Sequence, residues 1–495
     1  MPIIDSPHDD TVDELVRHRL RKLQELRARG IEPYPTTVER TITNAEAVAA
    51  YDRLADTVVS VAGRLISRRI MGRASFGHIQ DGTGRIQLFI KADLVGPETY
   101  EIFRDLIDIG DFLGATGRLM KTRTGEVSVE VSRLVLLAKS LRPLPEKWHG
   151  LTDVEKRYRQ RYLDLIVNPE VRRIFRIRSA AVSAIRRFLE DRGFIEIETP
   201  VLQPLYGGAA ARPFKTYHHA LDQELYLRIA TELYLKRAIV GGFDKVFEIG
   251  RVFRNEGIDS THNPEFTVLE SYEAYASYTD VMAMVEEMIP WLARTVLGTT
   301  TITYQGNEID LARPWRRISL REAILDRTGI DIEATTDRDE LYRQAAPLNL
   351  PIQPTSSRAK IIDELLSSKV EKSLIQPTFV VDYPVELSPL AKRKPGRPDL
   401  VERFEAYIGG IEIANAFTEL NDAIDQRARF AQQLEARAAG DEEAHLFDED
   451  FIVSLEHGMP PTGGLGIGID RLVMLLTDQR SIREVILFPH LRTIE

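Results

Sequence analysis

Apolar and polar residues alternate with a period of two in several short stretches between residues 58 and 142. The stretches read VVSVAGRLISRR, ASFGHIQDGTGRIQLFI, DFLGATGRLMK and EVSVEVSRLVLL, and glycines mark the turns and bends. One helical pattern, YEIFRDLIDIG, interrupts the series. Short strands with a single intervening helix predict a five-stranded OB-fold barrel, a fold that binds single-stranded nucleic acid.

A helical period follows from residue 171, in VRRIFRIRSAAVSAIRRFLEDRG. Its apolar stripe predicts a helix packed on a core, and consists of Ile174, Ile177, Ala181, Ile185 and Phe188 or Leu189. Strands, helices and long hairpins then follow without regular βαβ alternation. This order predicts an antiparallel sheet flanked by helices, so the fold class expected for the whole chain is α+β.

The chain divides into four segments on these patterns. We expect a basic helix and lead-in over residues 1–57, the OB barrel over 58–142, a proline-marked linker over 143–170 and the larger domain over 171–495. The first segment has an excess of basic side chains, which favours phosphate binding, although its acidic residues also allow a solvated helix with i,i+4 pairs. The basic residues are Arg17, Arg19, Arg21, Lys22, Arg27 and Arg29.

The segment KVFEIGRVFRNEGIDSTHNPEFTVLESYEAY predicts a strand, a polar loop and a second strand. Arg254 and Glu256 follow the first strand, and His262 lies in the loop. In the second strand, the period of two places Phe266, Val268, Glu270 and Tyr272 on one face. An aromatic ring, a carboxylate and a phenol beside an arginine are unusual for a packed core, so this face is a candidate functional surface.

Gly409 and Gly410 separate two alternating runs, RFEAYI and IEIANAFTEL, and predict a tight β-hairpin. In that register Tyr407 faces Glu412, and Glu405 points to the same side as Glu412. Two carboxylates so placed repel each other unless a cation lies between them, and Mg²⁺ prefers such oxygen ligands. A pair of solvated strand carboxylates is the alternative on the hairpin alone.

The run GLGIGID, residues 464 to 470, predicts a strand that a ligand or another backbone approaches closely. Asp470 is expected to cap the helix that follows. Arg471 then lies in the first helical turn, where free amides and the helix dipole favour phosphate. The run matches neither a P-loop nor a dinucleotide-binding fingerprint.

These segments together resemble a known family. FRNEG…HNPEF is similar to motif 2 of the class II aminoacyl-tRNA synthetases, GLGIGIDR to motif 3, and GFIEIETPVL to motif 1, the strand of the family's dimer interface. TELYLKR, RRIMGRASF and IGGIEIANAFTELND narrow the resemblance to the lysyl-tRNA synthetases. It extends from about residue 15 to the C-terminus.

The resemblance implies ATP-dependent ligation of L-lysine to tRNA(Lys) through an enzyme-bound lysyl-adenylate, with Mg²⁺ bound alongside ATP and a homodimer formed through the motif 1 region. It implies catalytic roles for Arg254 and Arg471, ATP contacts from these two and from Glu256, His262 and Phe266, and metal binding by Glu405 and Glu412. Phe76, Gln87 and Glu126 match anticodon-binding positions. The implied lysine-binding residues are Gly207, Gly208, Glu232, Glu270, Tyr272, Asn415, Phe417 and Glu419.

A substrate ammonium group is costly to desolvate unless carboxylates surround it, and this set of acidic residues supplies them. A pocket for aspartate would need a cation facing the side chain instead. Two alternatives remain: a related aspartate or asparagine ligase, and a non-catalytic tRNA-binding paralogue. The second would be expected to have lost motif arginines or metal carboxylates, and the matched positions are all present.

In an unbroken strand, Glu412 would point away from Asn415, Phe417 and Glu419. If all four residues serve one pocket, the strand must contain a bulge or bend near Ile413–Ala414. We therefore predict an irregularity there.

Composition is ordinary for a globular protein, with 43% hydrophobic and 28% charged residues among 495. The chain has no cysteine, which excludes disulfides and cysteine-ligated zinc. The net charge of −10 does not exclude a nucleic-acid partner, because net charge says little about local patches. No signal peptide and no membrane-spanning run are visible, so we expect a cytoplasmic protein without a membrane partner.

Overall fold

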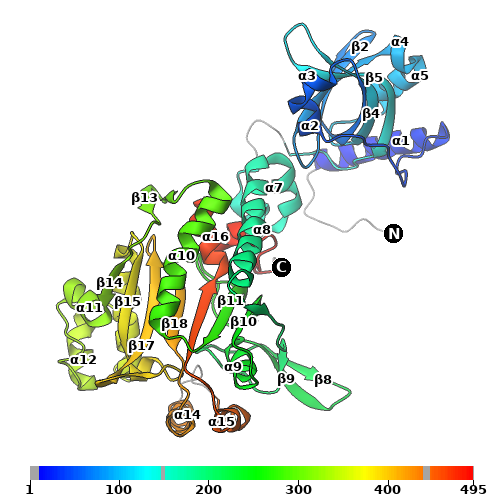
Figure 1. Ribbon diagram of the computed structural model, residues 1–495. Coiled ribbons are helices and arrows are strands. Elements are labelled where there is room, and N and C mark those ends of the chain that lie inside the picture. Colours follow the sequence, from blue (N-terminus) through cyan, green and yellow to red (C-terminus); the bar gives the residue numbers. More distant parts are fainter. Residues whose placement is uncertain (1–9, 146–150, 439–445, 494–495) are drawn as a thin grey trace. The chain divides into compact units, whose positions relative to one another are not determined.

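The computed structural model describes residues 10–145, 151–438 and 446–493. The chain forms two compact units, residues 1–152 and 153–495 (Figure 1). The first nine residues, where no signal peptide is expected, and residues 146–150 of the expected linker lie outside the described residues. No described helix is long and apolar enough to cross a membrane.

The first unit contains a closed five-stranded barrel, which confirms the predicted OB fold. Its strands are β1 (Val58–Met71), β2 (Ala74–Gln80), β3 (Arg85–Lys91), β4 (Phe112–Lys121) and β5 (Val127–Ala138), paired in the order β1-β2-β3-β5-β4. Between β3 and β4 lie α4 (Ala92–Val95) and α5 (Pro97–Asp105), and before the barrel come α1 (Asp10–Ala28), α2 (Asn44–Ala49) and α3 (Tyr51–Leu54).

The alternation of side chains builds the barrel core. Ile79 and Leu88 are fully buried inside it, whereas His78 and Phe89 on the other face remain partly accessible. At Gly117 a Cβ atom would lie 2.0 Å from the Glu130 carbonyl oxygen, so only glycine permits the close approach of β4 and β5.

The second unit is built on a nine-stranded sheet, largely antiparallel, which confirms the expected α+β fold class. Its edge pairs β14–β15 and β10–β6 are parallel. The strand order is β14 (Arg316–Ser319), β15 (Thr378–Pro384), β17 (Arg397–Ile408), β18 (Ile411–Thr418), β19 (Thr462–Gly468), β11 (Glu265–Ala274), β10 (Lys245–Phe253) and β6 (Ile195–Glu196), with β16 (Arg393–Lys394) paired to β17.

Three helices cover one face of this sheet: α8 (Pro169–Glu190), α10 (Tyr278–Leu297) and α16 (Ile469–Thr477) (Figure 1). The predicted stripe of α8 is buried there, and both Phe188 and Leu189 belong to it. Leu269 and Leu465 meet the helices from the sheet. Burial of such side chains stabilises the fold by about 1.5–3 kcal/mol each.

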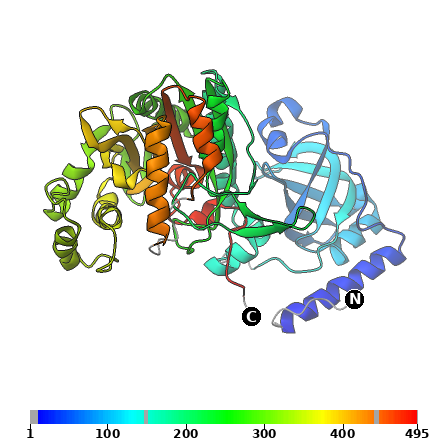
Figure 2. The ribbon, with the colours of Figure 1, turned by 90° about the horizontal axis from the view of Figure 1, so that it is seen from below.

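Further elements surround the sheet. Helices α14 (Ala423–Ala438) and α15 (Glu449–Glu456) lie side by side (Figures 1 and 2). The remaining elements are α6 (Val154–Arg159), α7 (Arg161–Val167), β7 (Leu202–Gln203), β8 (Lys215–His218), β9 (Gln223–Leu227), α9 (Glu232–Val240), β12 (Thr301–Tyr304), β13 (Asn307–Asp310), α11 (Leu320–Thr328), α12 (Arg338–Ala345), α13 (Arg358–Leu365) and α17 (Ile482–Val485), with short 3₁₀ or π turns between 346 and 387.

Part of the expected linker is built into the second unit. The guanidinium of Arg161 in α7 is fully buried, donates to Asp164 at 2.6 Å and donates to the carbonyls of Arg483 and Leu487. These bonds tie α7 to the C-terminal segment.

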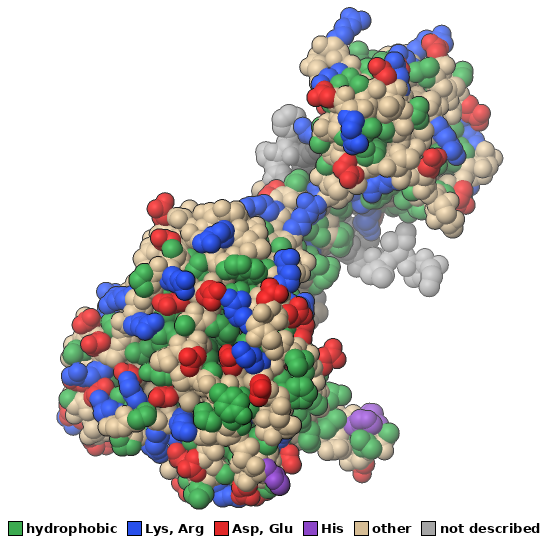
Figure 3. Space-filling model, viewed as in Figure 1, with side chains coloured by type: hydrophobic (Ala, Val, Ile, Leu, Met, Phe, Trp, Pro, Cys, Tyr) green, Lys and Arg blue, Asp and Glu red, His purple; other side chains and the backbone are tan. Residues whose placement is uncertain are grey.

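Positive and negative side chains are interspersed over the visible surface (Figure 3), as expected for 65 basic and 75 acidic residues.

Candidate active site and nucleic-acid interface

A cavity of about 590 Å³ opens on the sheet face opposite the helix-covered core, a size typical of small-molecule sites. Strand β11 shows why it forms there. Leu269 is fully buried in the core, while Phe266, Val268, Glu270 and Tyr272 alternate with core positions and line the cavity. The period of two predicted from the sequence therefore holds along this strand.

The hairpin between β17 and β18 has the predicted tight turn, with Gly409 and Gly410 at φ of 64° and 73°. Tyr407 pairs with Glu412 and Ala406 with Ala414, so Ile413 has no partner on β17. The predicted irregularity near Ile413–Ala414 is confirmed. Because of this bulge, Glu412 lines the same cavity as Asn415, Phe417 and Glu419.

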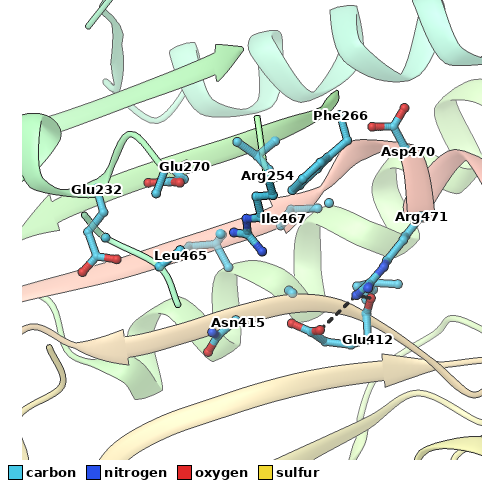
Figure 4. A pocket seen from close by; sticks show the side chains of 18 of the residues that line it. Glu232, Arg254, Phe266, Glu270, Glu412, Asn415, Leu465, Ile467, Asp470 and Arg471 are labelled. Atoms are coloured by element: carbon cyan, nitrogen blue, oxygen red, sulfur yellow. Dashed lines mark hydrogen bonds and ion pairs between the residues drawn. The ribbon is translucent and has the colours of Figure 1, made fainter. Parts of the chain in front are cut away.

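One end of the cavity is acidic, and we call Glu232, Glu270, Tyr272 and Glu419 the acid end. Figure 4 shows Glu232 and Glu270 at the end of the cavity away from Arg471. All four side chains are at least nine-tenths buried. The Tyr272 hydroxyl donates to Glu270 at 3.3 Å, and the backbone amide of Thr231 donates to the other oxygen of Glu270 at 3.2 Å.

Burial and mutual repulsion raise the pKa of every carboxyl group at the acid end. Burial, then the nearby charge of Glu232, raises the pKa of Glu270 to about 7. Burial also raises the pKa of Glu419 well above its usual value, and it raises the pKa of Glu232. Glu419 Oε2 is paired with Lys236, whereas Glu419 Oε1 accepts no hydrogen bond within the described residues. The acid end is thus prepared for a bound cation.

Two basic residues that were not predicted from the sequence contact side chains that line the cavity. Lys236 forms ion pairs with Glu232 and Glu419. Arg403 donates to Asn415 Oδ1 at 3.0 Å, which leaves the amide NH₂ of Asn415 as the end available to a ligand. In TELYLKR a glutamate stands four residues before a lysine, which could have predicted the pair between Glu232 and Lys236. That spacing could not have predicted that the pair is buried.

The opposite end carries Arg471, in the first turn of α16 as predicted. Arg471 Nη1 lies 2.9 Å from a carboxylate oxygen of Glu412 (Figure 4). His262 Nε2 is 3.2 Å from Arg471 Nη2, and His262 Nδ1 is 2.8 Å from Asp259. Because arginine only donates, His262 accepts at Nε2 and donates from Nδ1. This end offers cationic and donor groups to an anion.

Arg254 lies between the two ends, and Phe266 lies beside it (Figure 4). The Arg254 Cζ atom is 5.1 Å from the centroid of the Phe266 ring, and Nε donates to the carbonyl of Ile229 at 3.4 Å. Burial lowers the pKa of Arg254, although Glu256, Glu270 and Glu412 oppose the effect. The exposed Glu256 also lines the cavity. All the predicted ATP-binding residues therefore line this one cavity.

Asp470 differs from expectation. The residue that caps α16 is Gly468, and Asp470 lies inside the first turn without a capping bond. Its carboxylate instead accepts from the backbone amide of Thr267 and from Arg178 of α8, each at 2.6 Å. The cap prediction is wrong because a cross-element partner outcompeted the helix amides. Asp470 joins β11, α8 and α16 at the wall of the cavity.

Glu405 faces the same side of the sheet as Glu412 but is held by other groups. Its carboxylate accepts from the hydroxyls of Tyr383 and Tyr407 and pairs with Arg403 at 2.6 Å. Burial, then the charges of Glu412 and Glu405, raises the pKa of nearby Glu371 to about 8. Within the described ranges, no group of three or more His, Cys, Asp or Glu side chains is placed to hold a metal ion.

The two predicted glycines have different places. Gly208, at φ of 86°, lines the cavity beside Glu232, where a Cβ would lie 3.0 Å from that of Glu232. Gly207 packs against Leu233, 2.8 Å from where its Cβ would be. Gly208 is therefore the one whose backbone meets the cavity.

The outer face of the barrel carries a second cluster, formed by the predicted anticodon residues. Phe76 stacks on Phe89, with ring centroids 4.7 Å apart and an interplanar angle of 11°. Gln87 donates to Glu126 at 2.7 Å, and His78 lies 2.8 Å from the other oxygen of Glu126. A flat aromatic pair beside an amide and a carboxylate suits base stacking and base-edge contacts.

Comparison with known proteins assigns both units to known families. Residues 153–492 match the family described as tRNA synthetases class II (D, K and N), and residues 59–137 match the OB-fold nucleic acid binding domain. The lysine–tRNA ligase of Chloroflexus aurantiacus is 60% identical over 484 residues, which cover 97% of this chain and 99% of that protein. The chain belongs to the lysine–tRNA ligase family.

Two further lysine–tRNA ligases support the assignment. That of Carboxydothermus hydrogenoformans is 58% identical, over 97% of this chain and 98% of its own length. That of Pelotomaculum thermopropionicum is 57% identical, over 99% of this chain and 97% of its own length. The family described as D, K and N does not by itself separate lysine from aspartate and asparagine ligases, but these relatives do not favour the alternatives.

Proposed function

We propose that the protein activates L-lysine with ATP and transfers it to tRNA(Lys). The acid end carries this proposal. Glu419 is 1% exposed; its Oε2 atom is paired with Lys236, and its Oε1 atom accepts no hydrogen bond among the described residues. A buried carboxylate in that state favours a donor that brings positive charge, and the ε-ammonium of lysine supplies three N–H groups and one charge.

The arrangement suggests how the amino acid is oriented. Glu419 and Tyr272 meet the ε-ammonium, Phe417 lines the aliphatic stem, and Glu232 meets the α-ammonium beside the Gly208 backbone. The Asn415 NH₂ group donates to the substrate carboxylate. A site of buried carboxylates rejects a substrate without the ammonium, because its charges would then remain unpaired.

Arg254 lies where the two substrates meet. A lysine carboxylate oxygen attacks the α-phosphorus of ATP, a new O–P bond forms, and the bond to the β-phosphate oxygen breaks as pyrophosphate leaves with the electron pair. Two anions approach each other in this step, so positioning and cationic stabilisation lower the barrier. Arg254 bridges the carboxylate and the α-phosphate, and removal of such a charge typically costs about 10²–10³ in rate.

The remaining cavity residues hold ATP. Phe266 stacks on adenine, Glu256 accepts from the exocyclic amine, and Arg471 with His262 contacts the γ end of the phosphates. The hydrogen bond from His262 to Asp259 supports this use, because it fixes the imidazole orientation.

The carboxylates near Arg471 fit Mg²⁺ bound with ATP. Burial, then the nearby charges of Glu412 and Glu405, raises the pKa of Glu371 to about 8, and a divalent cation would relieve this excess of negative charge. Mg²⁺ is commonly bound by one or two carboxylates together with substrate phosphates, so Glu412 and Glu405 would hold it. When bound, it would neutralise charge on the phosphates.

The barrel recognises the tRNA anticodon in this proposal. A base stacked on the Phe76–Phe89 pair gains about 1–3 kcal/mol, and Gln87 and Glu126 contact base edges. Their mutual hydrogen bond supports a preformed site, because both side chains are already oriented. The proposed tRNA partner fits action in the cytoplasm.

A homodimer through the motif 1 region is also part of the proposal. Strand β6 lies at an edge of the large sheet, and Ile195 there is 50% exposed. Leu202 and Leu205 follow at 47% and 42%. Exposed apolar side chains along an unpaired edge favour an interface. Sedimentation of the purified protein as a monomer at micromolar concentration would contradict it.

The activity is tested by ATP–pyrophosphate exchange with Mg²⁺ and each of the twenty amino acids, without tRNA. We expect exchange with lysine and with no other amino acid at comparable concentration. Exchange with aspartate or asparagine would mean that the acid end is misassigned. No exchange with any amino acid, with or without added tRNA, would favour a non-catalytic tRNA-binding role.

A further inference from the structure

Lys236 lies behind the acid end, one helical turn after Glu232 in α9. Its Nζ is 2.5 Å from a carboxylate oxygen of Glu232 and forms a second ion pair with Glu419. The side chain is fully buried. Two rings flank the ammonium, with the centroids of Phe417 and Phe451 at 5.5 and 5.8 Å. The residues that line the cavity include both carboxylates but not Lys236.

Packing alone does not account for this lysine. A buried ammonium carries a large desolvation penalty, and an apolar side chain of similar volume often stabilises a fold equally well or better. Lys236 contacts the two carboxylates that are expected to hold opposite ends of the substrate. Its effect on a ligand must therefore pass through Glu232 and Glu419.

The charges around Lys236 form a simple balance. Three carboxylates face Lys236: Glu232 from α9, Glu419 from the end of β18 and Glu270 from β11. Tyr272 of β11 is neutral. Arg403 of β17 is paired with Glu405. With all three carboxylates ionised, the state that a bound ammonium favours, the one ammonium leaves two negative charges at the acid end. Lysine brings two ammonium groups, and its carboxylate is matched by Arg254. Without Lys236 the occupied site would retain one uncompensated negative charge.

We propose that Lys236 is a positioning residue that determines specificity: it holds Glu232 and Glu419 in place and sets the acid end at minus two, the charge that a substrate with two ammonium groups neutralises. This inference rests on the proposed function and assigns a role to a residue outside the cavity wall.

Lysine-dependent exchange in four proteins tests it: wild type, Lys236→Met, Glu232→Gln and the double variant. Glu232→Gln leaves the acid end at minus one, and the double variant returns it to minus two. We expect Lys236→Met to raise the lysine KM about tenfold with a smaller change in kcat. The lysine KM of the double variant should lie below that of Glu232→Gln, although it carries one more substitution.

Lys245→Met is the matched control. Lys245 pairs with Glu273 at 2.7 Å and is partly exposed, away from the cavity lining, so its lysine KM should equal that of wild type. Thermal unfolding establishes that each variant is folded. If Lys236→Met does not fold, the comparison of Glu232→Gln with the double variant decides alone.

Additive losses, an unchanged lysine KM in Lys236→Met, or a double variant that fails to fold would overturn the inference and assign Lys236 to structure. Wild-type exchange with lysine would in each case leave the proposed function standing. Wild-type protein that exchanges with another amino acid instead would overturn both.

Discussion

At the residue scale, the chemistry depends on groups whose proton affinity the fold has changed. Glu270 is buried next to Glu232 and has a pKa of about 7, so near neutral pH it is charged in only part of the molecules. A bound ammonium favours its ionised form. Lysine affinity should therefore depend on pH just where an ordinary glutamate would have no effect.

We expect the affinity for lysine to fall several-fold between pH 8 and pH 6. Because the folded-state pKa is raised, Glu270 takes up a proton as the pH decreases through about 7, and the neutral acid holds an ammonium less well. Calorimetric titration of lysine without ATP measures this directly. Glu270→Gln should bind more weakly and show a smaller pH dependence than wild type in this range, and a flat wild-type profile would contradict the prediction.

Gly464 gives a second prediction at this scale. A Cβ at residue 464 would lie 1.8 Å from Glu419 Oε1 and 2.7 Å from the Tyr272 ring. Gly464→Ala must therefore displace the groups expected to hold the ε-ammonium. We expect a rise in the lysine KM of about 10²-fold, comparable to the loss of a well-oriented charged contact.

Gly466→Ala is the matched control for Gly464→Ala. It lies two residues along the same strand and also lines the cavity, but among the described residues its Cβ would approach only the Asn415 carbonyl oxygen at 3.7 Å, an ordinary contact. Equal effects of the two substitutions on the lysine KM would show that an added methyl group on this strand, rather than displacement of Glu419, is responsible.

At the element scale, the site depends on irregularities and cross-links between regular elements. The period of two in β11 was sufficient to predict which of its side chains share the cavity, and the need to orient Glu412 with Glu419 predicted the bulge at Ile413. The Gly–Gly turn placed Glu405 on the same side as Glu412, but Glu405 does not line the cavity. Asp470 could not be predicted in the same way. Its sequence position satisfies the capping rule, whereas its actual partners, Thr267 and Arg178, are about 200 and 290 residues away.

Lys236 shows the same limit. An acid and a lysine four residues apart are typical of a solvated helix surface. Only the packing of Phe451 and the return of Glu419 to this place turn the pair into a buried one. The spacing of residues along the sequence predicts which side chains are neighbours on one helix or strand. It does not predict which of them are buried by segments that come later in the chain.

Asp470→Ala should destabilise the second unit by about 3 kcal/mol, because it leaves the Arg178 guanidinium without its buried partner and the Thr267 amide without an acceptor. The 17% exposure of Arg178 places the effect at the low end for buried pairs. Urea denaturation followed by tryptophan fluorescence measures it, since Trp291 and Trp315 belong to this unit. Asp470→Asn should lose less, because an amide oxygen still accepts from Thr267; equal losses would assign the effect to charge alone.

At the scale of the whole molecule, the two units have separate hydrophobic cores and separate candidate sites. The core of the first unit consists of residues between Leu26 and Leu136, and the cores of the second begin at Ile174. The adenylation cavity is lined entirely by residues of the second unit. The aromatic pair and the Gln87–Glu126 bond lie entirely in the first.

This separation predicts that residues 153–495 alone retain lysine-dependent ATP–pyrophosphate exchange within several-fold of the full chain. The same fragment should charge tRNA(Lys) about 10²-fold less efficiently, because base stacking and edge contacts of roughly 1–3 kcal/mol per base are lost. The full chain with Phe76→Ala and Gln87→Ala should show the same division, exchange intact and charging impaired, without truncation. Loss of exchange in a truncated protein whose circular dichroism and cooperative unfolding show a folded second unit would contradict independence. Such a loss would mean that the first unit supports the activity of the cavity as well as tRNA binding. The full-chain variant with Phe76→Ala and Gln87→Ala would then separate the two effects, since it alters tRNA recognition without removing the barrel.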